Sequence, residues 1–322
     1  MEEYPFTLTR PDGEQIHGEM RIAHSEEGQD PSTDRQHSST DRQHPAIHQQ
    51  GPSTHRHKGS AREGPPRTAV VIIHGFKGFR RWGFFPHLAR RLAEAGHAAI
   101  TFDFSRNGVG PGGEDFDELE AFAKNTFTRE LEEVAQVVEA LEGGQLPAPA
   151  PERIALLGHS RGGGTAILAA SELSDTIDAL ITWAAVASFD RWGDEVKEEW
   201  RREGRIHIPN ARTGQDMPLD IGLLEDLERH RSRLDIQAAA QRIKMPWCII
   251  HGTRDESVPV EEARKLHAVA ASAELELIPG AGHTFGAGHP FGAESSDLTK
   301  AIERTRSHLR RTWSDDLSGH AK

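Results

Sequence analysis

The stretch GHSRG at residues 158–162 is the part of the sequence best suited to covalent chemistry. It follows the apolar run at 153–157 and precedes 165–173, whose composition favours a helix. A G-x-S-x-G pattern between a strand and a helix is typical of a nucleophile elbow, a tight turn that exposes the serine hydroxyl. The dipole at the start of that helix favours the negative charge that develops during acyl transfer. The pattern therefore predicts Ser160 as a nucleophile; the alternative is a tight turn with a solvated serine.

A serine hydroxyl is a weak nucleophile and needs a base within hydrogen-bonding reach. In proteins with this elbow, the base comes from a loop after the last strand. His283 lies on such a glycine-rich loop, in LIPGAGHTFG at 277–286, and is the predicted base. His289 in the following HPFG is the alternative.

The base in turn needs a carboxylate that fixes its tautomer and stabilises its charged form. Asp255 lies in the turn after the apolar run 246–251 and is the predicted acid, with Glu256 as the alternative. The resulting order of serine, aspartate and histidine along the chain is the order this architecture requires.

Two backbone N–H groups are expected to stabilise the oxyanion of the intermediate. One belongs to Arg161, the residue after the nucleophile, and the other to Phe76 in HGFKG at 74–78. Gly75 allows that second stretch of backbone to approach the substrate closely.

Aromatic and basic residues near the predicted strand ends offer weaker signals about the substrate. Phe79, Trp82 and Trp183 are candidates for lining a substrate pocket, and core packing is the alternative for each. Four arginines could meet an anionic substrate, although solvated surface positions are favoured for them: Arg80, Arg81, Arg106 and Arg161.

Strand-like and helix-like segments alternate from residue 68 onward, which predicts an α/β fold with a mostly parallel central sheet and helices on both faces. The apolar runs expected to form buried strands are 69–74, 98–104, 153–158, 178–184, 246–251 and 273–278. Helical spacing of apolar residues is found at 84–96, 118–142, 161–173, 260–271 and 295–312.

Changes in composition divide the chain into parts. Residues 1–23 read as a hairpin around the turn Pro11-Asp12-Gly13. The segment 24–66 is rich in Ser, Gln, His and Pro and repeats STDRQH, so we expect a disordered insertion, its histidines being solvated and not metal ligands. We expect the α/β core at 67–187 and 243–314, interrupted by a cap insertion at 188–242.

Charge and cysteine content limit the partners and the location. The net charge of −12 argues against nucleic acid, because phosphate binding needs a basic surface. No apolar run reaches the roughly 20 residues that span a bilayer, so no membrane association is expected. The single cysteine, Cys248, lies in an apolar run where a buried, inert thiol is expected. With no intrachain disulfide possible and no signal peptide in the first residues, a cytoplasmic location is predicted.

The motifs VVIIHGFKG, FDFSRNG, GHSRGG, HGTRDESVP and GAGHTF together resemble the α/β-hydrolase superfamily. Over about 67–312 the chain is similar to bacterial serine esterases of the cinnamoyl/feruloyl-esterase-like and prolyl-oligopeptidase-like branches. The resemblance implies a triad of Ser160, Asp255 and His283, with an oxyanion hole from Phe76 and Arg161, that hydrolyses carboxylic esters without a cofactor or metal. A small peptidase or amidase with the same triad, or a non-catalytic binding protein, are the alternatives. The cap has no clear counterpart, so a feruloyl substrate is not carried over.

Overall fold

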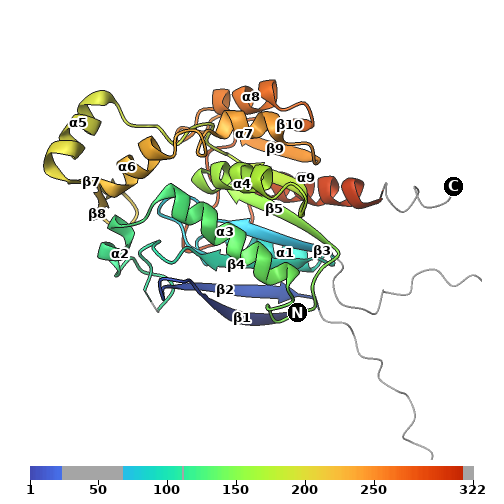
Figure 1. Cartoon of the computed structure of the whole chain (residues 1–322). Helices are drawn as coiled ribbons and strands as arrows, with labels where there is room; N and C mark the ends of the chain where they lie inside the picture. The colour runs from blue at the N-terminus through green and yellow to red at the C-terminus, as the bar shows by residue number, and fades with distance from the viewer. Residues whose placement is uncertain (24–67, 111, 315–322) are drawn as a thin grey trace, which may run out of the picture. The chain divides into compact units, whose positions relative to one another are not determined.

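Eight strands form one sheet in the computed structural model, which describes residues 1–23, 68–110 and 112–314 (Figure 1). The strand order is β1-β2-β4-β3-β5-β6-β9-β10. The strands from β4 to β10 in this order run parallel, and β2 pairs antiparallel with both β1 and β4. Their bounds are β1 (Glu2–Thr9), β2 (Gln15–Ile22), β3 (Thr68–Ile73), β4 (Ala98–Asp103), β5 (Arg153–His159), β6 (Ile177–Trp183), β9 (Trp247–Gly252) and β10 (Ala273–Ile278). The predicted α/β fold with a mostly parallel sheet and an N-terminal hairpin is confirmed.

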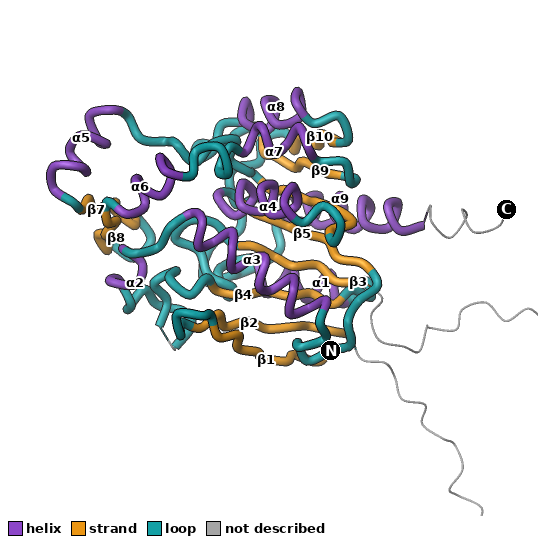
Figure 2. Tube along the Cα trace, viewed as in Figure 1, coloured by secondary structure: helices purple, strands orange, loops and turns teal. Residues whose placement is uncertain are grey.

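Helices cover both faces of this sheet. On one face, α3 packs beside α4, α4 beside α7 and α7 beside α8, and Figure 1 shows α3 and α4 in front of the strands. On the other face, α1 packs beside α9. Figure 2 shows these helices alternating with the strands along the trace. The bounds are α1 (Phe85–Ala93), α3 (Phe127–Glu142), α4 (Arg161–Glu172), α7 (Ile236–Arg242), α8 (Val260–Val269) and α9 (Ser296–Ser314).

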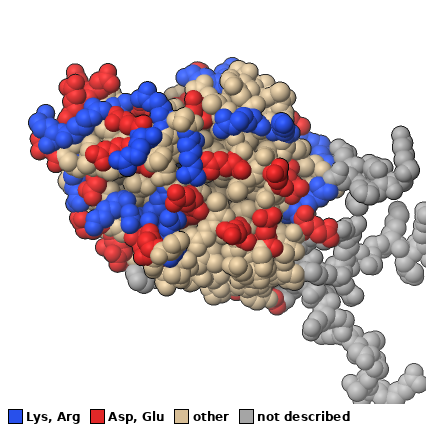
Figure 3. All heavy atoms as spheres, viewed as in Figure 1, with Lys and Arg blue, Asp and Glu red and all other residues tan. Residues whose placement is uncertain are grey.

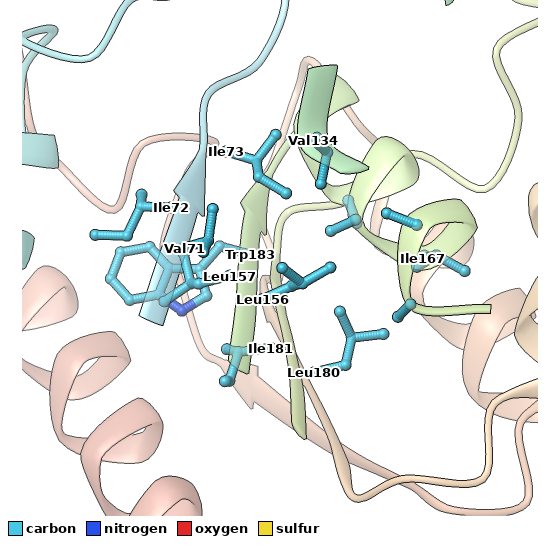
Figure 4. Close-up of a cluster of buried hydrophobic side chains, with 14 of the residues drawn as sticks. Val71, Ile72, Ile73, Val134, Leu156, Leu157, Ile167, Leu180, Ile181 and Trp183 are labelled. Carbon is cyan, nitrogen blue, oxygen red and sulfur yellow. The ribbon is translucent and has the colours of Figure 1, made fainter. Parts of the chain in front are cut away.

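The centre of the core is formed by β3, β5 and β6, whose side chains are buried on both faces of the sheet. Val71, Leu156 and Ile181 are fully buried, and Figure 4 shows them between the layers with Trp183 and, on α4, Ile167. Parallel strands covered by helices on both sides read as continuous apolar runs for this reason. These three strands form a rigid base for the loops at their carboxyl ends.

One predicted helix differs from the observed structure. The segment 118–142 contains two helices, α2 (Leu119–Ala123) and α3. Thr126 has an extended backbone at the break, and its hydroxyl accepts a hydrogen bond from the Arg129 N–H, so it caps α3. A periodic apolar pattern does not reveal such a break when the two helices bury similar faces.

The segment predicted as a cap contains three helices and a small two-stranded sheet, and the first two helices flank that sheet along the chain. These are α5 (Asp194–Glu203), β7 (Arg205–Asn210), β8 (Gln215–Asp220) and α6 (Gly222–Arg229), with β7 and β8 paired antiparallel. The last helix of the segment, α7, packs instead against α4 and α8 in the helical layer. The predicted disordered insertion at 24–66 lies outside the described residues. None of the described helices is both long and apolar enough to cross a membrane.

Candidate active site

Ser160 lies at a sharp turn between β5 and α4. Its backbone has φ 59° and ψ −124°. A positive φ of this kind costs free energy for a residue with a side chain. A Cβ on Gly158 would meet the Gly162 carbonyl oxygen at 2.2 Å, and a Cβ on Gly162 would meet the His74 oxygen at 2.3 Å. Both contacts are with backbone, so only glycine fits at these two positions. The two glycines therefore allow the chain to turn sharply from β5 into α4 at Ser160.

The structure brings the serine, the predicted base and the predicted acid into one hydrogen-bonded chain. His283 Nε2 lies 3.0 Å from Ser160 Oγ, and His283 Nδ1 lies 2.8 Å from Asp255 Oδ2. Nδ1–H donates to the carboxylate, which leaves Nε2 free to accept from the serine hydroxyl. This arrangement can remove a proton from the hydroxyl while it attacks a carbonyl carbon.

Asp255 is held as a carboxylate although its side chain is fully buried. Burial alone raises the pKa of a carboxyl group. Hydrogen bonds from His251, from His283 and from the Val258 backbone outweigh it, so the pKa of Asp255 lies below its ordinary value. The other oxygen accepts from the N–H groups of Ser257 and Val258 at 2.9 and 2.8 Å. The acid therefore remains charged at neutral pH and points toward the base.

Neither alternative residue occupies the triad position. The His289 ring accepts a hydrogen bond from the Gly83 N–H at 3.1 Å and packs against Phe79 and Trp82. Glu256 is exposed, and the carboxylate bonded to His283 is that of Asp255.

The two predicted oxyanion donors lie on either side of Ser160. Arg161 is the first residue of α4, where an N–H has no acceptor within its own helix. Phe76 follows Gly75, and a Cβ on Gly75 would lie 2.9 Å from Ser160 Cβ, so this backbone passes directly beside the nucleophile. The Arg161 guanidinium stacks 4.5 Å from the Phe76 ring and pairs with buried Glu130, which ties the two donor segments together.

His159, the residue before the nucleophile, was not singled out by its sequence. It is buried, and its Nε2–H donates to the His283 carbonyl oxygen at 2.9 Å. Burial, reinforced by the charge of His283, lowers the pKa of His159 to about 3, so the ring is neutral. His159 therefore holds the loop that carries the base. The only sequence signal for it is its place inside the elbow.

A cavity of about 580 Å³ opens over Ser160 and His283. Trp82 lines it, as predicted for the substrate pocket. Phe79 and Trp183 do not, and these two expectations are wrong. Phe79 is buried against Phe116, and Trp183 is fully buried with its indole N–H donating to Thr305 in α9. The apolar part of the lining comes instead from residues of other elements: Phe76, Phe85, Phe127, Val186, Phe189, Trp192 and Val258.

The four arginines singled out from the sequence are all engaged in ion pairs. Arg80 and Arg81 pair with Glu19 of β2, and Arg80 also pairs with Asp103 at the end of β4. Arg106 pairs with Glu14 in the hairpin turn, and Arg161 with Glu130. Arg80, Arg81 and Arg106 thus fix the N-terminal hairpin to the core. The sequence does not show this role, because each arginine lies far along the chain from its partner.

Other reactive side chains contribute nothing to this site. Cys248 is buried in β9, and burial raises the pKa of its thiol to about 12, as expected of an inert cysteine. Across the described ranges, no group of three or more His, Cys, Asp and Glu side chains is arranged to hold a metal ion.

The parallel sheet, the elbow after β5 and the loops after β9 and β10 define an α/β-hydrolase architecture. The chain belongs to the alpha/beta hydrolase family, whose sequence model matches residues 70–293.

Several proteins are similar to this chain in sequence or in fold. An uncharacterized protein of Mycobacterium tuberculosis (strain H37Rv) is 28% identical over 174 residues, which cover 41% of this chain and about half (51%) of that protein's length. The fold of Est1E from Butyrivibrio proteoclasticus is similar, with 17% identity, a TM-score of 0.61 and coverage of 97% of this chain and 99% of that one. The esterase domain of a Rhodothermus marinus protein has 18% identity, a TM-score of 0.56 and coverage of 97% and 99%.

Proposed function

We propose that the protein is a serine hydrolase that cleaves carboxylic esters through an acyl-enzyme intermediate on Ser160. The observation that carries the proposal is the unbroken path from the serine hydroxyl through His283 to Asp255, with spacings of 3.0 and 2.8 Å. The esterases among the structural neighbours support it.

In this mechanism Ser160 Oγ attacks the ester carbonyl while His283 Nε2 takes the hydroxyl proton. The N–H groups of Phe76 and Arg161 stabilise the oxyanion, and His283 then gives the proton to the leaving alkoxide. Water attacks the acyl-enzyme with His283 again as base, which releases the acid and restores Ser160. Asp255 keeps its proton-free form throughout and compensates the charge on the imidazolium.

We place the substrate under a cap formed by the segment 188–242. Trp192 and Arg212 of this segment line the cavity over the serine. Arg212 donates a hydrogen bond to the Lys77 carbonyl, and Lys77 Nζ donates to the Pro209 carbonyl at 3.0 Å. These bonds join the β7–β8 hairpin to the loop that carries the oxyanion donor Phe76.

The proposal is tested by Ser160→Ala, with Ser272→Ala as a matched control. Ser272 is bonded to the Ile243 carbonyl, away from the cavity. We expect a fluorophosphonate probe to label the wild type and Ser272→Ala but not Ser160→Ala. Hydrolysis of 4-nitrophenyl butyrate should fall by roughly 10³-fold or more in Ser160→Ala. Equal labelling of Ser160→Ala and the wild type would refute the assignment of the nucleophile.

A further inference from the structure

The charged side chains that line the cavity are all cationic. Lys77, Arg161, Arg191 and Arg212 are among the lining residues, and no Asp or Glu of the described chain is. This contrasts with the whole chain, whose net charge is −12. It also contrasts with the exterior of the cap, where Figure 3 shows both signs of charge interspersed. The cavity is thus selectively positive in an acidic protein.

Two of the four cations are already neutralised by protein carboxylates. Arg161 pairs with Glu130, and Arg191 pairs with Glu262 of α8. Their charges are therefore largely satisfied before any substrate binds.

The other two cations, Lys77 and Arg212, have no carboxylate within 4 Å in the described parts of the chain. The Lys77 ammonium donates to a backbone carbonyl of the cap, and Arg212 donates to the carbonyl of Lys77. The Arg212 guanidinium also lies 4.8 Å from the centre of the Trp82 ring. A backbone oxygen and a ring face orient these groups but do not cancel their charge.

The surroundings only partly desolvate the two uncompensated charges, since Lys77 is half-buried and Arg212 is exposed. Burial lowers the pKa of Lys77, and the nearby charge of Arg212 lowers it further. Burial also lowers the pKa of Arg212. Two like charges held together in a partly desolvated cavity are stabilised by an anion that contacts both, through charge-assisted hydrogen bonds.

The rest of the lining suits an apolar group. Phe127 and Phe189 stack face to face with ring centres 4.3 Å apart, and Trp192 lies beside Phe127. The cavity therefore combines a cationic part contributed by Lys77 and Arg212 with an aromatic part contributed by the start of α3 and of the cap.

We propose that Lys77 and Arg212 bind a carboxylate carried by the ester substrate, so that the enzyme prefers half-esters and other anionic esters to neutral ones. This inference rests on the proposed esterase function, since it concerns the selectivity of the same site. Arg212 supplies a planar pair of N–H donors, and Lys77 supplies a compact charge, which together match a carboxylate.

The test compares matched pairs of esters that differ in charge. For the acyl side we would use 4-nitrophenyl hemiglutarate and 4-nitrophenyl valerate; for the alcohol side, 4-acetoxybenzoate and its methyl ester. We expect kcat/KM to favour the anion by roughly tenfold or more in one pair, which also identifies the side that carries the charge. Arg212→Gln and Lys77→Gln should each reduce that ratio by about tenfold. The matched control is Arg202→Gln, an exposed arginine of α5 outside the lining, which should leave the ratio unchanged.

The outcomes separate this inference from the proposed function. Hydrolysis that depends on Ser160 but shows no preference for the anion in either pair would overturn the inference and leave the esterase intact. A preference that Arg212→Gln and Lys77→Gln leave unaltered would overturn it as well. If no ester is cleaved, the esterase proposal fails. Calorimetric titration of Ser160→Ala then still decides the inference, because hemiglutarate must bind more tightly than valerate and must lose that advantage with Arg212→Gln.

Discussion

Acidification should destabilise this protein well above the pH at which carboxylates titrate, because two buried histidines of the site are held neutral. The pKa of His74 is lowered from 6.5 to about 4 by burial. The pKa of His159 is lowered from 6.5 to about 3, again chiefly by burial. Their exposures are only 4% and 5%, so water cannot solvate a charge on either ring.

The sign and size follow from proton linkage. Well above pH 6.5 neither ring is protonated in the folded or the unfolded chain, and their contribution to stability is complete. Below that pH the two rings bind protons in the unfolded chain but not in the folded chain. Each ring then lowers the free energy of unfolding by about 1.4 kcal/mol per pH unit. This continues until the pH approaches the pKa of that ring in the folded protein. Between pH 6.5 and 5 the two rings together should lower the free energy of unfolding by about 3 kcal/mol.

Urea denaturation at pH 7.5, 6.5, 5.5 and 5.0 measures this loss, and a histidine variant identifies its source. In His159→Gln an amide can still donate to the His283 carbonyl but cannot titrate. The slope between pH 6.5 and 5 should fall by about a third, because burial also lowers the pKa of His74 and of His97 to about 4, and these two rings keep their share. His207→Gln is the control, because His207 is exposed on β7 and solvated in both states. An unchanged slope in His159→Gln, or the same change in His207→Gln, would refute the reasoning.

Two substitutions test the geometry around the nucleophile. Asp255→Asn removes the negative charge that compensates the imidazolium, so kcat for ester hydrolysis should fall by roughly 10²–10⁴-fold while the chain stays folded by circular dichroism; activity within tenfold of the wild type would contradict the role of Asp255. Gly75→Ala places a Cβ 2.9 Å from Ser160 Cβ and 3.0 Å from the His159 carbonyl oxygen. The displaced oxyanion loop should reduce kcat by about 10²-fold with a smaller change in KM, and an unaltered kcat would show that the backbone at Phe76 does not serve the oxyanion.

The elbow and the strands around it could be predicted because their determinants are local. A strand that must turn at once into a helix needs glycine where backbones touch, and the contacts at Gly158 and Gly162 are of this kind. The apolar runs of the parallel strands likewise report burial on both faces directly. The order of Ser160, Asp255 and His283 along the chain then sufficed to select the residues that the structure brings together.

The parts that escaped prediction depend on contacts between distant segments. Arg212 approaches Lys77 only because the β7–β8 hairpin returns to the loop after β3, 135 residues away. Trp183 is the last residue of β6, which ends near the site, yet its indole N–H donates to Thr305 in α9, and no local pattern sets that direction. The sequence around an arginine also does not show whether a distant carboxylate will pair with it in the folded protein, as Glu19 pairs with Arg80.

The neutrality of His159 has a consequence for the proposed mechanism beyond stability. Its ring centre lies 4.7 Å from that of His283, the group that must become an imidazolium when Ser160 attacks. A second positive charge at that distance would raise the energy of the imidazolium by about 3.5 kcal/mol at an effective dielectric constant of about 20. Burial prevents this, because it lowers the pKa of His159 to about 3 and so keeps the ring uncharged at neutral pH. The same ring still donates the hydrogen bond that holds the His283 loop, so a neutral histidine serves here where a lysine or arginine donor would oppose the chemistry.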